Sequence, residues 1–279
     1  MIFKEALNGA EEGICLLCLD GQVINNKRYA DDTVLIATTP QHLQQLINRV
    51  ARTSELFNMR LNTPKTKIMI VQKIPKRYTF SFKVDGVQLE KVLSYTYLGT
   101  HMDWNQQHEI KRRIEMAGAA FNKMRTILCN MRLKLTTRIR VLKCYVFSVL
   151  LYGVEIWTLT EEMSRCLEAF EFWCYRRMLR ISWIYHVSNE TVLERMQKQP
   201  EIRNTVKQRK TSYLGHILRN PKNELLQTII KGEIAGRRGR GRPRISWMGN
   251  IMEWTELPAE EIFNRAMDRE IWARTTANV

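Results

Sequence analysis

Tyr29-Ala30-Asp31-Asp32 places two adjacent carboxylates directly before an apolar run, Thr33-Val34-Leu35-Ile36-Ala37. The apolar run predicts a buried β-strand, and the four residues before Tyr29 are polar (Asn-Asn-Lys-Arg). Aspartate tolerates turn conformations, so the Asp-Asp pair is predicted at the tip of a tight hairpin. With the helical apolar spacing that follows over residues 41–57, this hairpin indicates a mixed α and β fold for residues 1 to about 103.

Paired carboxylates on a rigid turn suit one kind of chemistry. Mg²⁺ prefers oxygen ligands and keeps substrate phosphates in its coordination shell. Two such ions can hold the attacking and leaving oxygens of an in-line phosphoryl displacement. The tetrapeptide taken alone also fits a surface turn that carries two solvated acids.

Further motifs follow in a fixed order. They are Leu61-Asn62-Thr63-Pro64-Lys65-Thr66-Lys67, then Tyr95-Thr96-Tyr97-Leu98-Gly99, then Leu214-Gly215-His216-Ile217-Leu218-Arg219, then residues 236–247. With the Tyr-Ala-Asp-Asp motif, this order resembles the C-terminal half of reverse transcriptases from LINE-type, non-LTR retrotransposons, especially the RTE-like group. The resemblance covers nearly the whole chain.

The resemblance implies an α+β fold in three parts. Residues 1–103 would be a partial reverse-transcriptase palm that carries the Tyr-Ala-Asp-Asp hairpin and a segment similar to a primer grip. Residues 104–219 would be a helical thumb and its continuation, and residues 220–279 a basic C-terminal region. The implied activity is RNA-directed DNA polymerase, a nucleotidyltransferase that uses Mg²⁺. Its partners would be an RNA template and a DNA primer, or an RNA–DNA duplex.

The same resemblance assigns roles in the catalytic site. Asp31 would bind the metal, and Asp32 would be a less strictly required neighbour that also contributes to the metal site. Lys65 would lie on the pyrophosphate side, where a cation can neutralise or protonate the leaving group. Lys67 competes for that role, and a solvated lysine at a strand end is the alternative for both.

Contacts to the primer would come from Tyr29 and from Tyr97-Leu98-Gly99. Tyr29 would lie near the primer terminus, and residues 97–99 would begin the segment that grips the primer end. The residues alone fit equally well an ordinary strand with a glycine bulge.

One motif of that family has no counterpart before Tyr29. The family carries a further aspartate, in a Phe-x-Asp motif on an upstream strand. The acids here are Glu5, Glu11, Glu12 and Asp20, and none stands in such a pattern; Asp20-Gly21 is typical of a hairpin turn. We therefore expect a truncated enzyme that is inactive alone. A noncatalytic nucleic-acid-binding protein and a decayed transposon product without selected function are the alternatives.

The charge of the chain favours a polyanionic partner. Forty-four lysines and arginines against 28 acids give a formal charge of +16. Ten of the cations lie between positions 111 and 143, with Glu115 as the one acid there: Lys111, Arg112, Arg113, Lys123, Arg125, Arg132, Lys134, Arg138, Arg140 and Lys143. This imbalance predicts sugar-phosphate contacts, which set position and affinity without reading base sequence.

A second basic stretch predicts an extended segment, because its arginines, glycines and proline cannot build a core. Its arginines are Arg237, Arg238, Arg240, Arg242 and Arg244. A nonspecific phosphate clamp is the leading interpretation. An AT-hook-like contact in the minor groove, or a nuclear-import sequence, is the alternative.

The remaining sequence features predict where the protein is found in the cell, which cysteines are buried and where the helices lie. No apolar run approaches the roughly 20 residues of a spanning helix, and no secretory leader pattern is evident, so we expect a nuclear or cytoplasmic protein that does not enter membranes. Cys15 and Cys18 have zinc-like spacing without a second pair, and Cys166 and Cys174 lie on an apolar helical pattern; all four are predicted core residues. Helices are predicted over residues 41–57, 110–128, 137–157 and 167–181, with two more after a cap at Ser188 and a break at Pro200.

Overall fold

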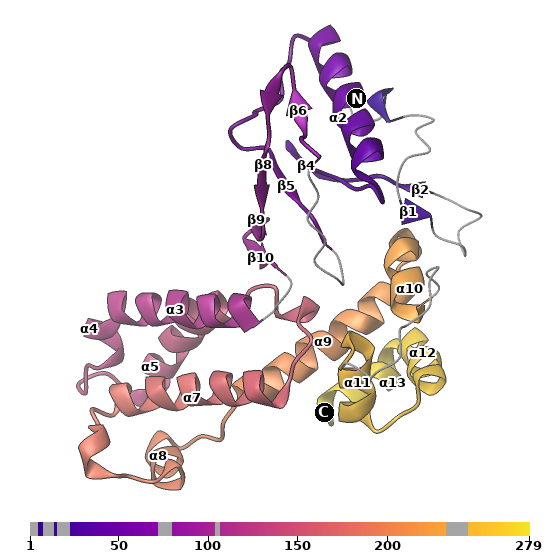
Figure 1. Ribbon diagram of the computed structural model, residues 1–279. Coiled ribbons are helices and arrows are strands. Elements are labelled where there is room, and N and C mark those ends of the chain that lie inside the picture. The colour runs from indigo at the N-terminus through magenta and orange to yellow at the C-terminus, as the bar shows by residue number, and fades with distance from the viewer. Residues whose placement is uncertain (1–4, 8–13, 16–22, 72–79, 104–106, 233–244) are drawn as a thin grey trace. The chain divides into compact units, whose positions relative to one another are not determined.

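A computed structural model of the chain describes residues 5–7, 14–15, 23–71, 80–103, 107–232 and 245–279 (Figure 1). The chain forms two compact units. The N-terminal unit comprises Met1–Tyr97, Met102–Trp104 and Leu225–Arg240, and the C-terminal unit comprises Leu98–His101, Asn105–Glu224 and Gly241–Val279.

Short paired strands make up most of the regular structure before residue 103. The pairs are β1 (Ile14–Cys15) with β2 (Val23–Ile24), β3 (Asn26–Tyr29) with β4 (Asp32–Leu35), β5 (Lys67–Met69) with β8 (Glu90–Val92), β6 (Lys83–Val84) with β7 (Val87–Gln88), and β9 (Tyr95–Tyr97) with β10 (Thr100–Met102). The β5–β8 pair is parallel, and the pairs β1–β2, β3–β4 and β6–β7 are antiparallel. Asp85-Gly86 is a dipeptide typical of tight hairpins, and the structure has a hairpin there: both residues have positive φ between β6 and β7.

Helix α2 (Pro40–Leu56) supplies the apolar face of the N-terminal unit, and it confirms the helix predicted over residues 41–57. The Thr39 hydroxyl caps its first turn by accepting from the His42 N–H. Its buried face packs into apolar clusters with the buried side chains of β5 and β6. Gln44 ties α2 to β6: its side-chain amide donates to the Lys83 carbonyl at 2.7 Å and accepts from the Lys83 N–H at 2.9 Å.

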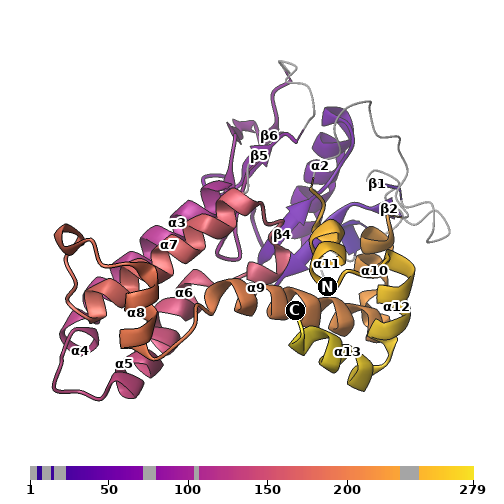
Figure 2. The ribbon, with the colours of Figure 1, turned by 90° about the horizontal axis from the view of Figure 1, so that it is seen from below.

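The C-terminal unit is helical. Its helices are α3 (Gln107–Lys123), α4 (Arg125–Leu128), α5 (Leu135–Val141), α6 (Ser148–Leu150), α7 (Glu161–Met178), α8 (Asn189–Met196), α9 (Ile202–Arg219), α11 (Trp247–Thr255), α12 (Ala259–Met267) and α13 (Arg269–Ala277). Helix α10 (Glu224–Lys231) is divided between the two units. Its first residue, Glu224, belongs to the C-terminal unit, and the rest of the helix belongs to the N-terminal unit. Helices α3 and α7 lie side by side in both views and share one large core with buried residues such as Phe121 and Phe170 (Figures 1 and 2).

Two predicted helices are interrupted. The helix expected over residues 110–128 ends at Lys123, and α4 starts after Met124. The helix expected over residues 137–157 passes through a π-helical segment, Leu142–Phe147, and its regular part ends at Leu150. Gly153 follows with φ +68°, and a side chain there would meet the Thr100 hydroxyl, since a Cβ would lie 3.3 Å from it. Apolar periodicity does not report these breaks, because the buried stripe continues across them.

The predicted helix cap and the predicted core cysteines are confirmed in part. The Ser188 cap of α8 is confirmed: its hydroxyl accepts from the Thr191 N–H at 3.2 Å. Cys174 is buried, as predicted, but Cys166 is exposed on α7, so its assignment to the core was wrong. Cys18 and the turn at Asp20-Gly21 lie outside the described residues. Within the described part of the chain, no helix is both long and apolar enough to cross a membrane.

Candidate nucleic-acid interface

The Tyr-Ala-Asp-Asp motif forms a hairpin between β3 and β4. Tyr29 pairs with Asp32, so Ala30 and Asp31 make the turn, and Ala30 has φ +51°. The sequence placed both acids at the tip, but Asp32 begins the strand β4. Both carboxylates are exposed, and 65% of Tyr29 is exposed, so the hairpin presents all three side chains to solvent.

The hairpin offers the oxygen ligands that Mg²⁺ prefers, but only two side chains supply them. Mg²⁺ commonly takes one or two protein carboxylates and completes its shell with waters and substrate phosphates. Asp31 and Asp32 could supply two carboxylates. In the described ranges, no group of three or more histidine, cysteine, aspartate or glutamate side chains comes together. The described residues thus offer at most part of a two-ion site.

The two candidate lysines near the strand β5 differ in their surroundings. Lys65 is exposed in a turn that Asn62 closes, because the Lys65 N–H donates to the Asn62 carbonyl and side-chain oxygens, each at 3.1 Å. Lys67 forms an ion pair with Glu90 on the neighbouring strand β8. Lys65 therefore keeps its ammonium group more available than Lys67 does.

In the Tyr97-Leu98-Gly99 segment, Tyr97 ends β9, and Leu98 and Gly99 form the turn to β10. Leu98 and Gly99 have φ values of +48° and +77°, which favour glycine at the second position. The Tyr152 hydroxyl donates to the Leu98 carbonyl at 2.9 Å, and a Cβ at Gly99 would lie 3.4 Å from the Tyr152 ring. Leu98-Gly99 is therefore the turn of a hairpin, where the alternative had been an ordinary strand with a glycine bulge; the primer contact stays a prediction.

A buried ion pair holds this turn. Arg113 and Glu109 are 4% and 3% exposed, and Arg113 Nε lies 2.6 Å from Glu109 Oε1. Arg113 also donates to the Gly99 carbonyl and lies over the Tyr152 ring at 4.5 Å. The second oxygen of Glu109 accepts from Arg112 at 3.0 Å and from the His101 N–H at 3.1 Å.

These contacts give Arg112 and Arg113 an internal role that sequence reasoning missed when it grouped them with residues predicted to bind phosphate. Arg113 has its guanidinium buried, and Arg112 also donates to the Gly99 carbonyl, at 3.3 Å. The i,i+4 spacing of Glu109 and Arg113 could have indicated the pair. Tyr152, in contrast, gave no sequence pattern that would link it to Leu98.

Two further cations of the 111–143 stretch are engaged internally. Arg138 is buried and donates to the Leu128 and Met178 carbonyls at 3.3 and 2.8 Å, which satisfies the ends of α4 and α7. Lys143 lies 2.6 Å from the Glu201 carboxylate, and this hydrogen bond raises the pKa of the lysine.

Six cations remain exposed, and none of them forms an ion pair within the described residues. We call them the α3–α5 basic set: Lys111, Lys123, Arg125, Arg132, Lys134 and Arg140. The predicted phosphate-binding residues Lys111, Lys123 and Arg125 belong to this set. The second predicted group, Arg237, Arg238, Arg240, Arg242 and Arg244, lies outside the described residues.

Comparison with known proteins gives one informative similarity. The chain is 27% identical over 263 residues to a transposon-derived protein of Caenorhabditis elegans, and the alignment covers 91% of this chain and 90% of that protein. No protein-family model matches the chain. No solved structure matches it. The chain is thus similar, over most of its length, to a protein of transposon origin.

Proposed function

We propose that this chain is a transposon-derived protein that binds nucleic acid through the α3–α5 basic set. Its origin would be the reverse transcriptase of a LINE-type, RTE-like retrotransposon. The similarity to the C. elegans protein supports the transposon origin. The ordered motifs from Tyr29 to Arg219 support the reverse-transcriptase origin. In this proposal the chain works in the nucleus or cytoplasm, on an RNA template with a DNA primer or on their duplex.

The observation that carries the proposal is the concentration of unpaired positive charge on α3–α5. Six exposed cations stand there without a carboxylate partner in the described ranges, while the neighbouring Arg113, Arg138 and Lys143 are internally bonded. Exposed cations that lack a protein partner are free to displace counterions from a sugar-phosphate backbone. Such contacts carry affinity without base specificity, which suits a surface that must hold any duplex.

Nucleotidyl transfer is a weaker proposal for this chain alone. In the proposed reaction Asp31 and Asp32 would hold Mg²⁺, and Lys65 would face the leaving pyrophosphate. Bound Mg²⁺ would neutralise phosphate charge at the site. The hairpin offers two carboxylates, and we propose that the complete site needs a further one. The chain would then bind a template–primer without extending the primer.

A fluorescence-polarisation titration of a labelled RNA–DNA duplex against salt concentration tests the binding proposal. Lys123→Gln/Arg125→Gln removes two members of the α3–α5 basic set. Lys222→Gln/Arg195→Gln removes two exposed charges that form no ion pair within the described residues, one just after α9 and one on α8, and is the matched control. Each lost phosphate contact should lower the slope of log affinity against log salt by about 0.9. The slope of log affinity against log salt should therefore fall by about 1.8 in the first variant and stay unchanged in the control. Equal slopes in the two variants would contradict the proposal.

The competing proposal is a decayed transposon product without a selected function. It shares the transposon origin but gives no reason for a localised phosphate-binding surface. Under that proposal, both double variants should weaken binding to the same small extent, because only total charge would matter. The same titration therefore separates the two.

A further inference from the structure

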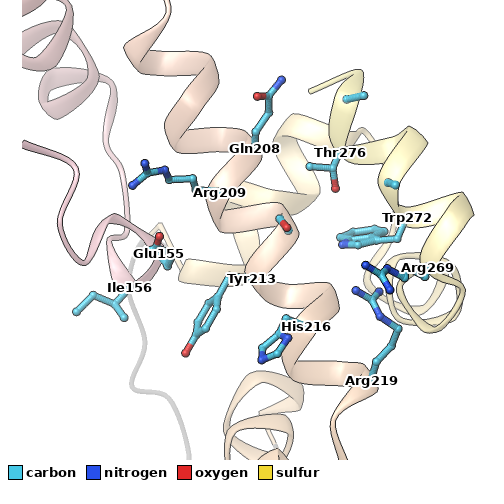
Figure 3. Close-up of a pocket in the computed structure, with 13 residues that line it drawn as sticks. Glu155, Ile156, Gln208, Arg209, Tyr213, His216, Arg219, Arg269, Trp272 and Thr276 are labelled. Atoms are coloured by element: carbon cyan, nitrogen blue, oxygen red, sulfur yellow. The ribbon is translucent and has the colours of Figure 1, made fainter. Parts of the chain in front are cut away.

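A second basic surface lies in the C-terminal unit, far from α3–α5 in sequence. It is an open groove of about 1270 Å³ between α9 and α13, bordered at one end by Glu155 and Ile156 (Figure 3). The walls carry Arg209, His216 and Arg219 from α9 and Arg269 from α13. Glu155 is the one acid among the lining residues, so the groove carries excess positive charge.

The arrangement of two arginines marks one end of this groove as a place for an anion. Arg219 and Arg269 come from different helices, and their guanidinium groups point toward one another (Figure 3). Like charges that approach one another repel, and an anion bound between them would offset that repulsion. Glu155 lies at the opposite end of the groove in the same view. One oxygen of the nearby Asp268 carboxylate, Oδ1, caps α13 by accepting from the Glu270 and Ile271 N–H groups, and Asp268 is not among the residues that line the groove.

Arg209 and Arg219 each donate one hydrogen bond that holds the side chain in place, and among the described residues their other N–H donors have no partner. Arg219 Nη1 donates to the Ala266 carbonyl at 2.6 Å, and Arg209 Nη1 donates to the Leu151 carbonyl at 3.3 Å. A guanidinium has five N–H donors, so each side chain is oriented and can still bind a phosphate. Arg209 and Arg219 stand ten residues apart on α9, about 15 Å along the helix axis. That spacing suits a polyanion better than one phosphate.

Tyr213 adds a flat surface between the charged ends. Its ring extends from α9 between Ile156 and His216 (Figure 3). Burial, and then the Glu155 carboxylate, raise the pKa of the Tyr213 phenol, so the ring stays neutral at physiological pH. A basic groove that also offers an aromatic face is the usual arrangement for binding single strands, because an unpaired base can stack on the ring.

We propose that the α9–α13 groove binds single-stranded nucleic acid, with a backbone phosphate between Arg219 and Arg269 and a base against Tyr213. The proposal rests on the proposed nucleic-acid-binding function and adds a second site, specific for an unpaired strand. A duplex would not use this site fully, because its bases are already stacked on one another.

The test compares two probes on the full chain by fluorescence polarisation: a labelled single-stranded 20-mer of mixed sequence, and the RNA–DNA duplex. Arg269→Gln removes an exposed groove charge, and Arg274→Gln removes an exposed charge from the same helix outside this groove. For the single strand, Arg269→Gln should lower the salt slope by about 0.7, and Arg274→Gln should leave it unchanged. Neither variant should alter duplex affinity more than twofold.

The ring is tested by a second matched pair. Tyr213→Leu should weaken single-strand binding about tenfold, whereas Tyr213→Phe should keep it, because the phenyl ring retains the stacking face. Equal effects of Arg269→Gln and Arg274→Gln on the single strand, or of Tyr213→Leu and Tyr213→Phe, would overturn the groove proposal. Duplex binding that responds to the α3–α5 variants would still stand in that case, so a failure here is distinguishable from failure of the general function.

Discussion

Gly215 on α9 leaves the space that the indole ring of Trp272 on α13 occupies. A Cβ at position 215 would lie 2.2 Å from Trp272 Cδ1 and 2.4 Å from its Nε1, closer than side chains can approach. The same indole N–H donates to the Thr211 carbonyl at 2.9 Å, and Trp272 is 2% exposed. The Leu-Gly-His-Ile-Leu-Arg motif is therefore the docking surface for the last helix, and it sets one wall of the α9–α13 groove.

We predict that Gly215→Ala destabilises the protein. Glycine to alanine inside a helix normally raises stability by about 0.5–1 kcal/mol, because alanine loses less backbone freedom on folding. Here the added methyl group collides with Trp272, and overpacking of this kind costs about 1–3 kcal/mol. Urea denaturation should show a net loss.

Gly118→Ala on α3 is the matched control for that variant. A Cβ at position 118 would lie 3.9 Å from the Phe170 ring, which is ordinary contact. This variant should be neutral or slightly more stable than the parent chain. A stabilised Gly215→Ala protein would show that α13 does not pack on α9 in this way.

Lys210 should make stability depend on pH. It is fully buried, donates to the Trp157 carbonyl and to Asn250 Oδ1, each at 2.9 Å, and lies near Trp247 and Trp254. Burial lowers the pKa of Lys210 to about 7 from 10.5. Below pH 7 both folded and unfolded chains hold this proton; between pH 7 and 10.5 the unfolded chain holds it more often. Stability should therefore rise with pH in that window, by at most about 1.4 kcal/mol per pH unit.

The variant Lys210→Met isolates this contribution, because methionine does not titrate. Free energies of unfolding at pH 7, 8 and 9 should climb less steeply in Lys210→Met than in the parent chain. The absolute stability of the variant is a poor readout, since the Trp157 carbonyl loses its donor. Parallel pH dependences for the two proteins would count against the burial of a titrating ammonium group.

Breaking the buried Glu109–Arg113 pair should lower the free energy of unfolding far more than breaking an exposed pair of the same spacing. Arg113→Met leaves the Glu109 carboxylate buried with less compensation, and such a change costs about 3–5 kcal/mol. Arg265→Met breaks the i,i+4 pair with Glu261, whose side chains are 41% and 42% exposed. Exposed pairs contribute about 0–1 kcal/mol, so this control should change stability little.

The double variant Glu109→Gln/Arg113→Met separates burial of charge from loss of packing. It should recover part of the stability that Arg113→Met loses, because position 109 then no longer carries a buried charge that has lost its Arg113 partner. Thermal unfolding of the three proteins provides the comparison. If Arg113→Met and Arg265→Met cost the same, the turn at Leu98-Gly99 does not depend on this buried pair.

A turn or helix was predictable from the sequence where the residues that cause it lie within the element itself. The hairpin at Asp85-Gly86 follows from its turn residues, and α2 follows from Pro40 and its apolar spacing. The breaks after Lys123 and at the π-helical segment were not predictable, because the apolar stripe runs through both.

The candidate site was predictable in part. The Tyr-Ala-Asp-Asp hairpin was expected, although Asp32 proved to start the strand. The burial of Arg113 and Arg138 was missed, because their partners include backbone carbonyls that leave no mark in the sequence. The α9–α13 groove was missed for a related reason: Arg219 and Arg269 are 50 positions apart, and both line one groove only because Trp272 of α13 packs against Gly215 of α9.

The last prediction concerns Asp31 and Asp32. Two exposed carboxylates on a turn should bind divalent cations weakly, and Mn²⁺ monitored by electron paramagnetic resonance should report this site. Asp31→Ala should abolish the signal of bound Mn²⁺, and Asp32→Ala should reduce it. Neither variant should change duplex affinity, because the α3–α5 basic set is distinct from the hairpin. We propose that the complete site needs a further carboxylate, whose loss would remove several kcal/mol of metal-ion stabilisation, so primer extension by the parent chain should be about a thousandfold slower than that of a complete reverse transcriptase. Efficient nucleotide incorporation that disappears in Asp31→Ala would instead show that two carboxylates suffice here, and the chain would then be a polymerase in its own right.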